Sequence, residues 1–347
     1  MAQTFQWLKA VYPRTSGGSA ADIPGGREMC DMSSARTIGH GSVLCRILSR
    51  RALGLLIAAG LVFLCSSAPA ATLEEVRKAG CLRHLGIPYA NFVTGLRDGM
   101  DVELMQQFAA YLGVRYEYVK TDWTSIFGDL TGRKVTPKGD EVILGETMPI
   151  RGDVAANGIT VLEWRRRVVD FSLPTFPNQV WLMARADAPQ RPIKPSGQLD
   201  RDIEATRGLI AEKTLLCKPG TCLDGALYHI EEARASVQVF NGGLNDMAPA
   251  LLGKEADLSL LDVPDALVAM MKWPGQLKVI GPISPPQEMA VAFAKNSTDL
   301  KDAFNRFLTE SSANGLLEGL VKKYYPYVLD YYPDFFTWHK AELPSKR

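Results

Sequence analysis

The sequence has almost no net charge and few histidines. It carries 39 Lys and Arg against 38 Asp and Glu, a formal net charge of +1, so no basic surface favours a nucleic-acid partner. Its four histidines are scattered singly and never cluster with the cysteines, which argues against a zinc site. Internal repeats and low-complexity tracts are also missing. We therefore expect no metal ion and no cofactor.

Long apolar stretches are missing as well, apart from one near the N-terminus. The apolar run LGLLIAAGLVFLC at 53–65 follows Arg50 and Arg51 and precedes the small residues Ala68-Pro69-Ala70. This pattern is typical of a cleaved secretory signal, so residues 1–70 are predicted to be leader and signal peptide, and the protein to be exported to the periplasm. Past residue 70 no run reaches the roughly 18 apolar residues of a membrane-spanning helix, which predicts a soluble mature protein.

Cys65 raises the alternative of a lipid anchor at the end of the apolar run. Leu64, directly before it, is large where a lipoprotein signal has a small residue, so the anchored form is less favoured than the cleaved one.

Cleavage would leave Cys81, Cys217 and Cys222. The segment CKPGTC is short enough for Cys217 and Cys222 to close a small disulfide loop in an oxidising compartment, and Pro219-Gly220 favours the turn. The spacing alone leaves open whether the pair is bonded or free.

The remaining chain alternates strand and helix patterns. In DVELMQQFAAYL, 101–112, apolar residues recur at helical spacing, with Asp101 as the expected N-cap and Gly113 as the expected end. Alternation of this kind predicts an α/β fold with mostly parallel sheets. The polar, glycine- and proline-rich stretch 131–151 is interpreted as a long loop or an inserted hairpin.

Two segments stand where ligands bind in such folds, beyond the carboxyl ends of strands. Gly158-Ile159-Thr160 ends one predicted strand and is followed by Arg165, and Asp262 follows DLSLL. An arginine fork binds a carboxylate through two hydrogen bonds, and an aspartate accepts from an ammonium group, so the pair would suit a zwitterion. The alternatives are that Arg165 belongs to a solvated run with its two neighbours, and that Asp262 only caps the next helix.

Other candidates have equally plain alternatives. Gly220-Thr221 would bring a hydroxyl and backbone N–H groups near an anion, but it would also make an ordinary turn. The aromatic residues Tyr89, Phe92 and Trp123 would stack on a ligand or simply fill the core.

The order of several motifs resembles family 3 of the extracellular solute-binding proteins, the amino-acid receptors of ABC importers. The pattern GIT, then EWR, then VVDFS-P is similar to the signature of that family. DGMDVELMQQFAAYLG, TDWTSIFGDL, CKPGTCLD, GKEADLSLLD and GLLEGLVKKYYP follow in family order. The resemblance covers roughly 73–326.

The resemblance implies a two-lobed periplasmic binding protein fold of type II, with two hinge strands between the lobes. Lobe 1 would comprise 72–177 and 286–340, and lobe 2 would comprise 178–285. The expected protein is a monomeric, non-enzymatic receptor that captures an amino acid or small carboxylate and delivers it to an ABC permease. A periplasmic sensor or accessory domain is the first alternative, and a dehydratase-type enzyme on the same scaffold is the second.

The resemblance also assigns roles to the candidate residues. Arg165 would hold the ligand carboxylate with help from Gly158, Thr160 and Thr221. Asp262 would take the amine, and Trp123 would stack on the ligand side chain.

This chain departs from the family pattern in three places. IPYANFVTG replaces a Pro-Pro-Phe-like step, which leaves Tyr89 and Phe92 both open as the second aromatic. The stretch 131–151 is longer than the usual connection. The aromatic tail YYPYVLDYYPDFF extends beyond the usual end, and packing on a lobe is favoured over a docking surface.

Overall fold

The structure is a computed structural model that describes residues 71–138, 141–333 and 335. The predicted leader, its cleavage site and Cys65 lie outside these residues, as does the tail from 336 onward. Across the described part of the chain, no helix is both long enough and apolar enough to cross a membrane.

The first sheet has five strands in the order β2-β1-β5-β14-β6. β1 pairs in parallel with β2 and with β5, whereas β14 runs antiparallel to β5 and β6. The strands are β1 (Cys81–Gly86), β2 (Arg115–Lys120), β5 (Val154–Ala155), β6 (Val169–Phe171) and β14 (Ala292–Ala294).

The second sheet has the order β10-β9-β11-β8-β12 and is likewise mixed. β9 is parallel to β10 and β11, and β8 is antiparallel to β11 and β12. In each sheet a single strand, β14 in the first and β8 in the second, runs opposite to the other four. The expectation that most strands of each sheet share one direction is therefore confirmed, although both sheets are mixed. The strands are β8 (Val180–Arg185), β9 (Thr214–Cys217), β10 (Ser236–Val239), β11 (Leu258–Asp262) and β12 (Leu277–Pro282).

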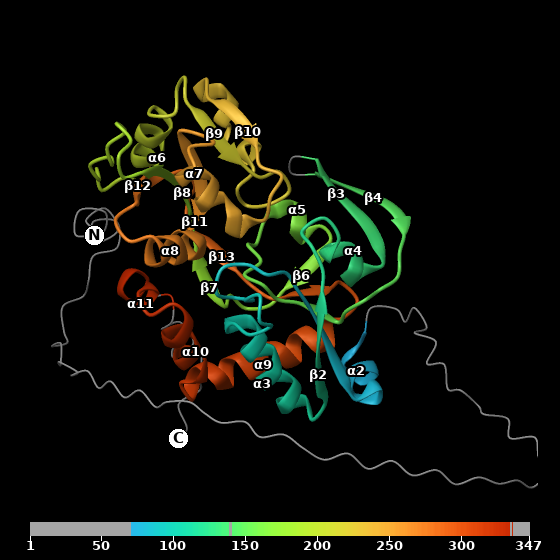
Figure 1. Ribbon diagram of the computed structural model, residues 1–347. Helices are drawn as coiled ribbons and strands as arrows, with labels where there is room; N and C mark the ends of the chain where they lie inside the picture. Colours follow the sequence, from blue (N-terminus) through green and yellow to red (C-terminus); the bar gives the residue numbers. More distant parts are fainter. Residues whose placement is uncertain (1–70, 139–140, 334, 336–347) are drawn as a thin grey trace, which may run out of the picture. The chain divides into compact units, whose positions relative to one another are not determined.

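Two short strands run between the two sheets. β7 (Phe176–Asn178) pairs antiparallel with β13 (Gln287–Met289) (Figure 1). Along the chain, β7 runs from the first sheet into β8 of the second, and β13 returns from β12 of the second sheet to β14 of the first. We call this pair the hinge strands.

Helices cover both sheets. α3, α9 and α10 pack on one another beside the first sheet (Figure 1), and α6, α7 and α8 accompany the second. The bounds are α2 (Leu73–Ala79), α3 (Met100–Leu112), α4 (Ile126–Thr131), α5 (Glu163–Arg166), α6 (Leu199–Arg207), α7 (Met247–Leu252), α8 (Val263–Lys272), α9 (Thr298–Ala313), α10 (Leu316–Tyr324) and α11 (Val328–Tyr331). Short 3-10 turns span Gly225–Tyr228, Ile230–Ala233 and Leu244–Asp246.

Helix α3 follows the predicted apolar pattern but starts differently. Its apolar side, including Met105 and Phe108, is fully buried, and Gly113 ends it in the left-handed conformation with φ of 75°. The prediction that Asp101 caps this helix was wrong, because the N-cap is Gly99 and Asp101 lies inside the first turn. The Asp101 side chain is only 2% exposed and is used elsewhere.

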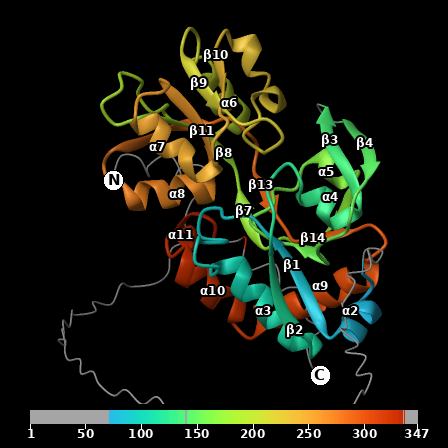
Figure 2. The same ribbon diagram turned by 45° about the vertical axis from the view of Figure 1, so that its right-hand side comes forward.

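The stretch 131–151 forms a hairpin of β3 (Arg133–Lys138) and β4 (Glu141–Thr147), which stands beside α4 (Figure 2). Val135 is buried, while Ile143 and Leu144 on the other strand are exposed. Of the two interpretations, loop or hairpin, the hairpin is confirmed.

Candidate functional site

Gly158 sits on an aromatic floor. Its φ is +65°, and a Cβ added there would lie 2.4 Å from Cδ2 of Phe92. The Gly158 N–H donates to Oδ2 of Asp101 at 2.7 Å. Phe92 is fully buried and packs edge-on against Phe176. Phe92 therefore supports the Gly158 backbone as a core residue, and Tyr89 remains as the aromatic candidate of this segment.

The arginine run divides into one buried and two exposed side chains. Arg166 and Arg167 face solvent, whereas Arg165 is only 1% exposed. Its Nη1 donates to the Thr160 carbonyl at 2.8 Å and its Nη2 to the Gly220 carbonyl at 3.3 Å. Residue 165 is thus not part of a solvated run.

Aromatic rings surround the Arg165 guanidinium. Its Cζ lies 5.5 Å from the ring centres of Trp123 and Phe127 and 5.2 Å from that of Trp164. Burial lowers the pKa of Arg165 to about 10. Among the described residues no carboxylate forms an ion pair with it, and its Nε has no hydrogen-bond partner. A buried cation without a counter-ion is costly, so this group is ready to accept an anion.

Asp262 ends β11 and begins α8. One carboxylate oxygen accepts from the Asp265 N–H at 3.3 Å, so it does cap the helix, and the same oxygen accepts from the Tyr89 hydroxyl. The other oxygen accepts from Sγ of Cys222 at 3.3 Å. Desolvation raises the pKa of Asp262 to about 6, although the hydrogen bonds from Tyr89 and Cys222 oppose this.

Tyr89 and Trp123 lie between the two charged residues. Their rings meet edge to face with centres 6.0 Å apart, and Trp123 in turn covers Arg165. The Arg165 and Asp262 charges act on each other's pKa without forming an ion pair. The fold has therefore gathered the predicted cation, carboxylate and two aromatics, from both sheets, into one cluster in which Arg165, Asp262 and Tyr89 are buried and Trp123 is half-buried.

The two threonines are close by but already engaged. Oγ1 of Thr160 accepts from the Asn178 amide at 3.1 Å, and Oγ1 of Thr221 donates to the Lys218 carbonyl at 2.8 Å. Both are 1% exposed. Each hydroxyl would have to share or exchange its bond to contact a ligand.

The suggested disulfide is not formed: Cys217 and Cys222 are free thiols. Their side chains have different neighbours. Sγ of Cys222 donates a hydrogen bond to Asp262. Sγ of Cys217 instead packs against Gly225, where an added Cβ would lie 3.1 Å from it. The loop is closed by a hydrogen bond instead of a disulfide: the Lys218 N–H donates to the Leu223 carbonyl at 2.9 Å.

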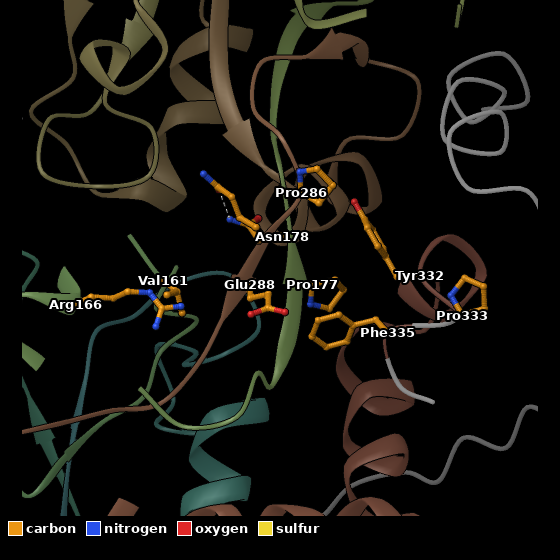
Figure 3. A pocket seen from close by; sticks show the side chains of 10 residues that line it. Val161, Arg166, Pro177, Asn178, Pro286, Glu288, Tyr332, Pro333 and Phe335 are labelled. Carbon is orange, nitrogen blue, oxygen red and sulfur yellow. Dashed lines mark hydrogen bonds between the residues drawn. The ribbon is translucent and has the colours of Figure 1, made fainter. Parts of the chain in front are cut away.

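A cavity of about 610 Å³ lies against the hinge strands (Figure 3). Pro177 and Asn178 come from β7 and Glu288 from β13, with Tyr332 and Phe335 on the opposite side from Arg166. The Asn178 amide that borders this cavity donates to both Thr160 and Gln287, so it connects the cavity wall to the cluster. Of the aromatic tail, Tyr325, Tyr331 and Tyr332 are buried and Phe335 packs against the core, which agrees with the packing interpretation, whereas Tyr327 is 52% exposed.

Sequence reasoning missed four residues of this region. Cys222 was considered only for a disulfide, and Asp101 only as a cap. Asp265 gave no functional signal, because it lies three residues after an N-cap, where acidic residues are common for structural reasons alone. Asn178 has no local signal, because its partners Thr160 and Val263 are distant in sequence.

Comparison with known proteins now decides the family. The family model for bacterial extracellular solute-binding proteins, family 3, matches residues 146–327, more than half of the chain. The chain belongs to this family. It is a solute-binding protein, as its motif order predicted.

Individual relatives are more distant. The chain is 26% identical over 235 residues to the L-cystine-binding protein TcyJ of Escherichia coli strain K12, which covers 67% of this chain and 75% of the relative. A mutant of ArgBP from T. maritima superposes with a TM-score of 0.58 at 23% identity, over 73% of this chain and 99% of the other. The ancestral amino acid-binding protein AncCDT-1, a precursor of cyclohexadienyl dehydratase, gives a TM-score of 0.57 at 20% identity, over 74% and 100%. The structural likenesses show the fold, which is the predicted type II periplasmic binding protein fold.

Proposed function

We propose that this solute-binding protein captures an amino acid, or a closely related small carboxylate, between two lobes and delivers it to an ABC permease. Lobe 1 would comprise 72–177 with 286–340, and lobe 2 would comprise 178–285. β7 and β13 would be the hinge. The family is described as extracellular, and the apolar run at 53–65 is typical of a signal peptide, so both support a periplasmic location and a cleaved leader.

One observation carries the proposal most directly: the buried Arg165 guanidinium has no carboxylate partner among the described residues and lies in one cluster with the buried carboxylate of Asp262. A ligand carboxylate would complete the hydrogen bonding of Arg165, and a ligand ammonium would neutralise Asp262. Gly158, Thr160 and Thr221 would contribute backbone and hydroxyl contacts, and Trp123 and Tyr89 would cover the rest of the ligand. Relatives named for binding L-cystine and arginine are consistent with this ligand class.

Because these residues are buried, a ligand would enter by opening of the hinge. The hydrogen bonds from Tyr89 to Asp262 and from Arg165 to Gly220 would break on opening and form again around the bound ligand. A ligand that contacts both lobes would favour the closed form.

Isothermal titration of the exported protein against amino acids tests the proposal. Arg165→Ala is expected to lower the affinity by at least about a hundredfold, since a buried charge-assisted pair is lost. Arg167→Ala removes an exposed arginine of the same run that does not line the cavity, and is expected to leave the affinity unchanged. Equal affinities of the native protein and the folded Arg165→Ala variant would reject the proposed site.

We propose a receptor rather than an enzyme. One observation favours the enzymatic alternative: Asp262, whose pKa is raised to about 6, has the property of a general acid, and AncCDT-1 is named as the precursor of a dehydratase. Turnover of a carboxylated cyclic substrate that is lost in Asp262→Asn would establish that alternative. For the sensor alternative, affinity capture would recover a receptor instead of a permease.

A further inference from the structure

Asp265 is a second buried carboxylate beside the proposed amine site. It lies in the first turn of α8 and is 4% exposed. Its Oδ2 accepts no hydrogen bond from any described residue, although its own N–H donates to Asp262. The carboxylate is close enough to Asp262 and to Tyr89 to raise the pKa of the Tyr89 hydroxyl.

The charges of the cluster do not balance. Arg165 contributes one positive charge, and Asp262 and Asp265 together carry two negative charges when both are ionised. The groups that act on Asp265 are Asp262 and Asp246, both acidic, and no cation among the described residues lowers its pKa. Burial, followed by the Asp262 charge, raises the pKa of Asp265 well above its usual range.

A zwitterion would correct only part of this imbalance. Its carboxylate would match Arg165 and its ammonium would match Asp262, which leaves Asp265 buried without a counter-ion or forces it to stay protonated. Either state has a free-energy cost that a cationic group placed beside it would remove.

We propose that Asp265 selects ligands with a second cationic group, so that the preferred solute is an amino acid of net positive charge. This rests on the proposed function and names the ligand class of the same site. Tyr89 donates to Asp262, and Trp123 contacts Tyr89, so the aliphatic part of such a side chain would run along aromatic faces. The ligand would exchange a proton on Asp265 for its own cationic group.

Matched ligand pairs test the selection. L-arginine is compared with L-citrulline, which has nearly the same shape but a neutral side chain. L-lysine is compared with Nε-acetyl-L-lysine, which is also neutral but carries an added acetyl group, so the arginine pair decides where the two pairs differ. The native protein is expected to bind the cationic member at least about tenfold more tightly. Titrations in buffers of different ionisation enthalpy are expected to show proton release on binding of the cationic member only.

The variant Asp265→Asn is expected to lose at least about tenfold in affinity for lysine and arginine and to change by less than about twofold for the neutral partners. Glu204→Gln, on the exposed side of α6, removes the same charge away from the site and is expected to change neither. Equal binding within each ligand pair would overturn the inference. So would an equal loss for both members in a folded Asp265→Asn protein, since that would make Asp265 structural.

These failures differ from failure of the proposed function. If the selection alone is wrong, neutral amino acids still bind and Arg165→Ala still abolishes binding. If the proposed function is wrong, neither member of any pair binds in an Arg165-dependent manner.

Discussion

The hydroxyl group of Tyr89 donates a hydrogen bond to Oδ1 of Asp262, although the two residues lie 173 positions apart in the sequence. Tyr89 follows β1 of the first sheet, and Asp262 ends β11 of the second. Burial and the Asp262 charge raise the pKa of Tyr89, so the phenol keeps its proton and acts as a donor. This hydrogen bond joins the two halves of the site, as the bond from Arg165 to the Gly220 carbonyl also does.

Tyr89→Phe is expected to weaken ligand binding by at least about tenfold. A hydrogen bond to a charged acceptor contributes about 1.5–3 kcal/mol, and its loss would disfavour the proposed closed form. Isothermal titration measures the effect, with Tyr111→Phe as control, because the exposed Tyr111 hydroxyl contacts only Glu310 at 3.4 Å among the described residues. Tighter binding by Tyr89→Phe would mean instead that the phenol competes with the ligand ammonium for Asp262.

Gly158→Ala is expected to destabilise the protein by about 2–4 kcal/mol. About 1 kcal/mol comes from placing a side chain at φ of +65°, and about 1–3 kcal/mol from the clash with Phe92. Gly220→Ala is a matched control, since its φ is also positive at +76° but the nearest atom, Cγ of Pro137, is 3.8 Å away. Denaturant unfolding without ligand should show the smaller loss, about 1 kcal/mol, for Gly220→Ala. Equal losses would show that Phe92 moves aside.

The sequence predicted most of the fold because its information is local. Helix α3 follows from the spacing of Met105, Phe108 and Leu112, and the hairpin at 131–151 was one of two interpretations of its turn residues. Which single strand of each sheet runs against the others was not predicted, because a strand such as β14 carries the same apolar residues whichever way it runs.

The sequence named the candidate residues that the fold brings together, but not the partners of their side chains. Arg165 and Asp262 stand out because each follows a strand end, where ligands bind in α/β folds. Two further features depend on contacts between segments that are distant in the sequence: Phe92 packs under Gly158, and Cys222 donates to Asp262. Spacing also suggested a disulfide where burial and hydrogen bonding hold two free thiols.

Those thiols should be inert in the folded protein. Cys217 is 1% exposed and Cys222 4%, and burial raises the pKa of Cys217 to about 12 and that of Cys222 well above its usual range. Ellman's reagent is expected to leave both unmodified under native conditions and to react with them after denaturation without reductant. Recovery of a peptide pair linked through Cys217 and Cys222 from the unreduced protein would contradict the structure.

Asp101 should make stability depend on pH between about 4 and 7. Its carboxylate is buried beneath Gly158, and desolvation raises its pKa from 3.8 to about 7, although the hydrogen bond from the Gly158 N–H opposes this. The folded protein then holds a proton that the unfolded chain releases, so this group's contribution to stability is largest at low pH and declines as pH rises through that window. At most about 4 kcal/mol is lost, because a tenfold difference in proton affinity between the folded and unfolded states corresponds to about 1.4 kcal/mol.

Asp101→Asn keeps an oxygen to accept from Gly158 and cannot ionise. Relative to the native protein it is expected to gain stability as pH rises from about 4 to 8, because only the native protein pays for a buried charge there. Denaturant unfolding at several pH values measures the difference, in which other buried acids such as Asp262 largely cancel. Glu74→Gln, at an exposed position of α2, controls for the loss of one negative charge. A difference that stays constant across this range would mean that Asp101 has the same pKa in the folded and unfolded states, and that the Gly158 loop rests on an ordinary ionised carboxylate.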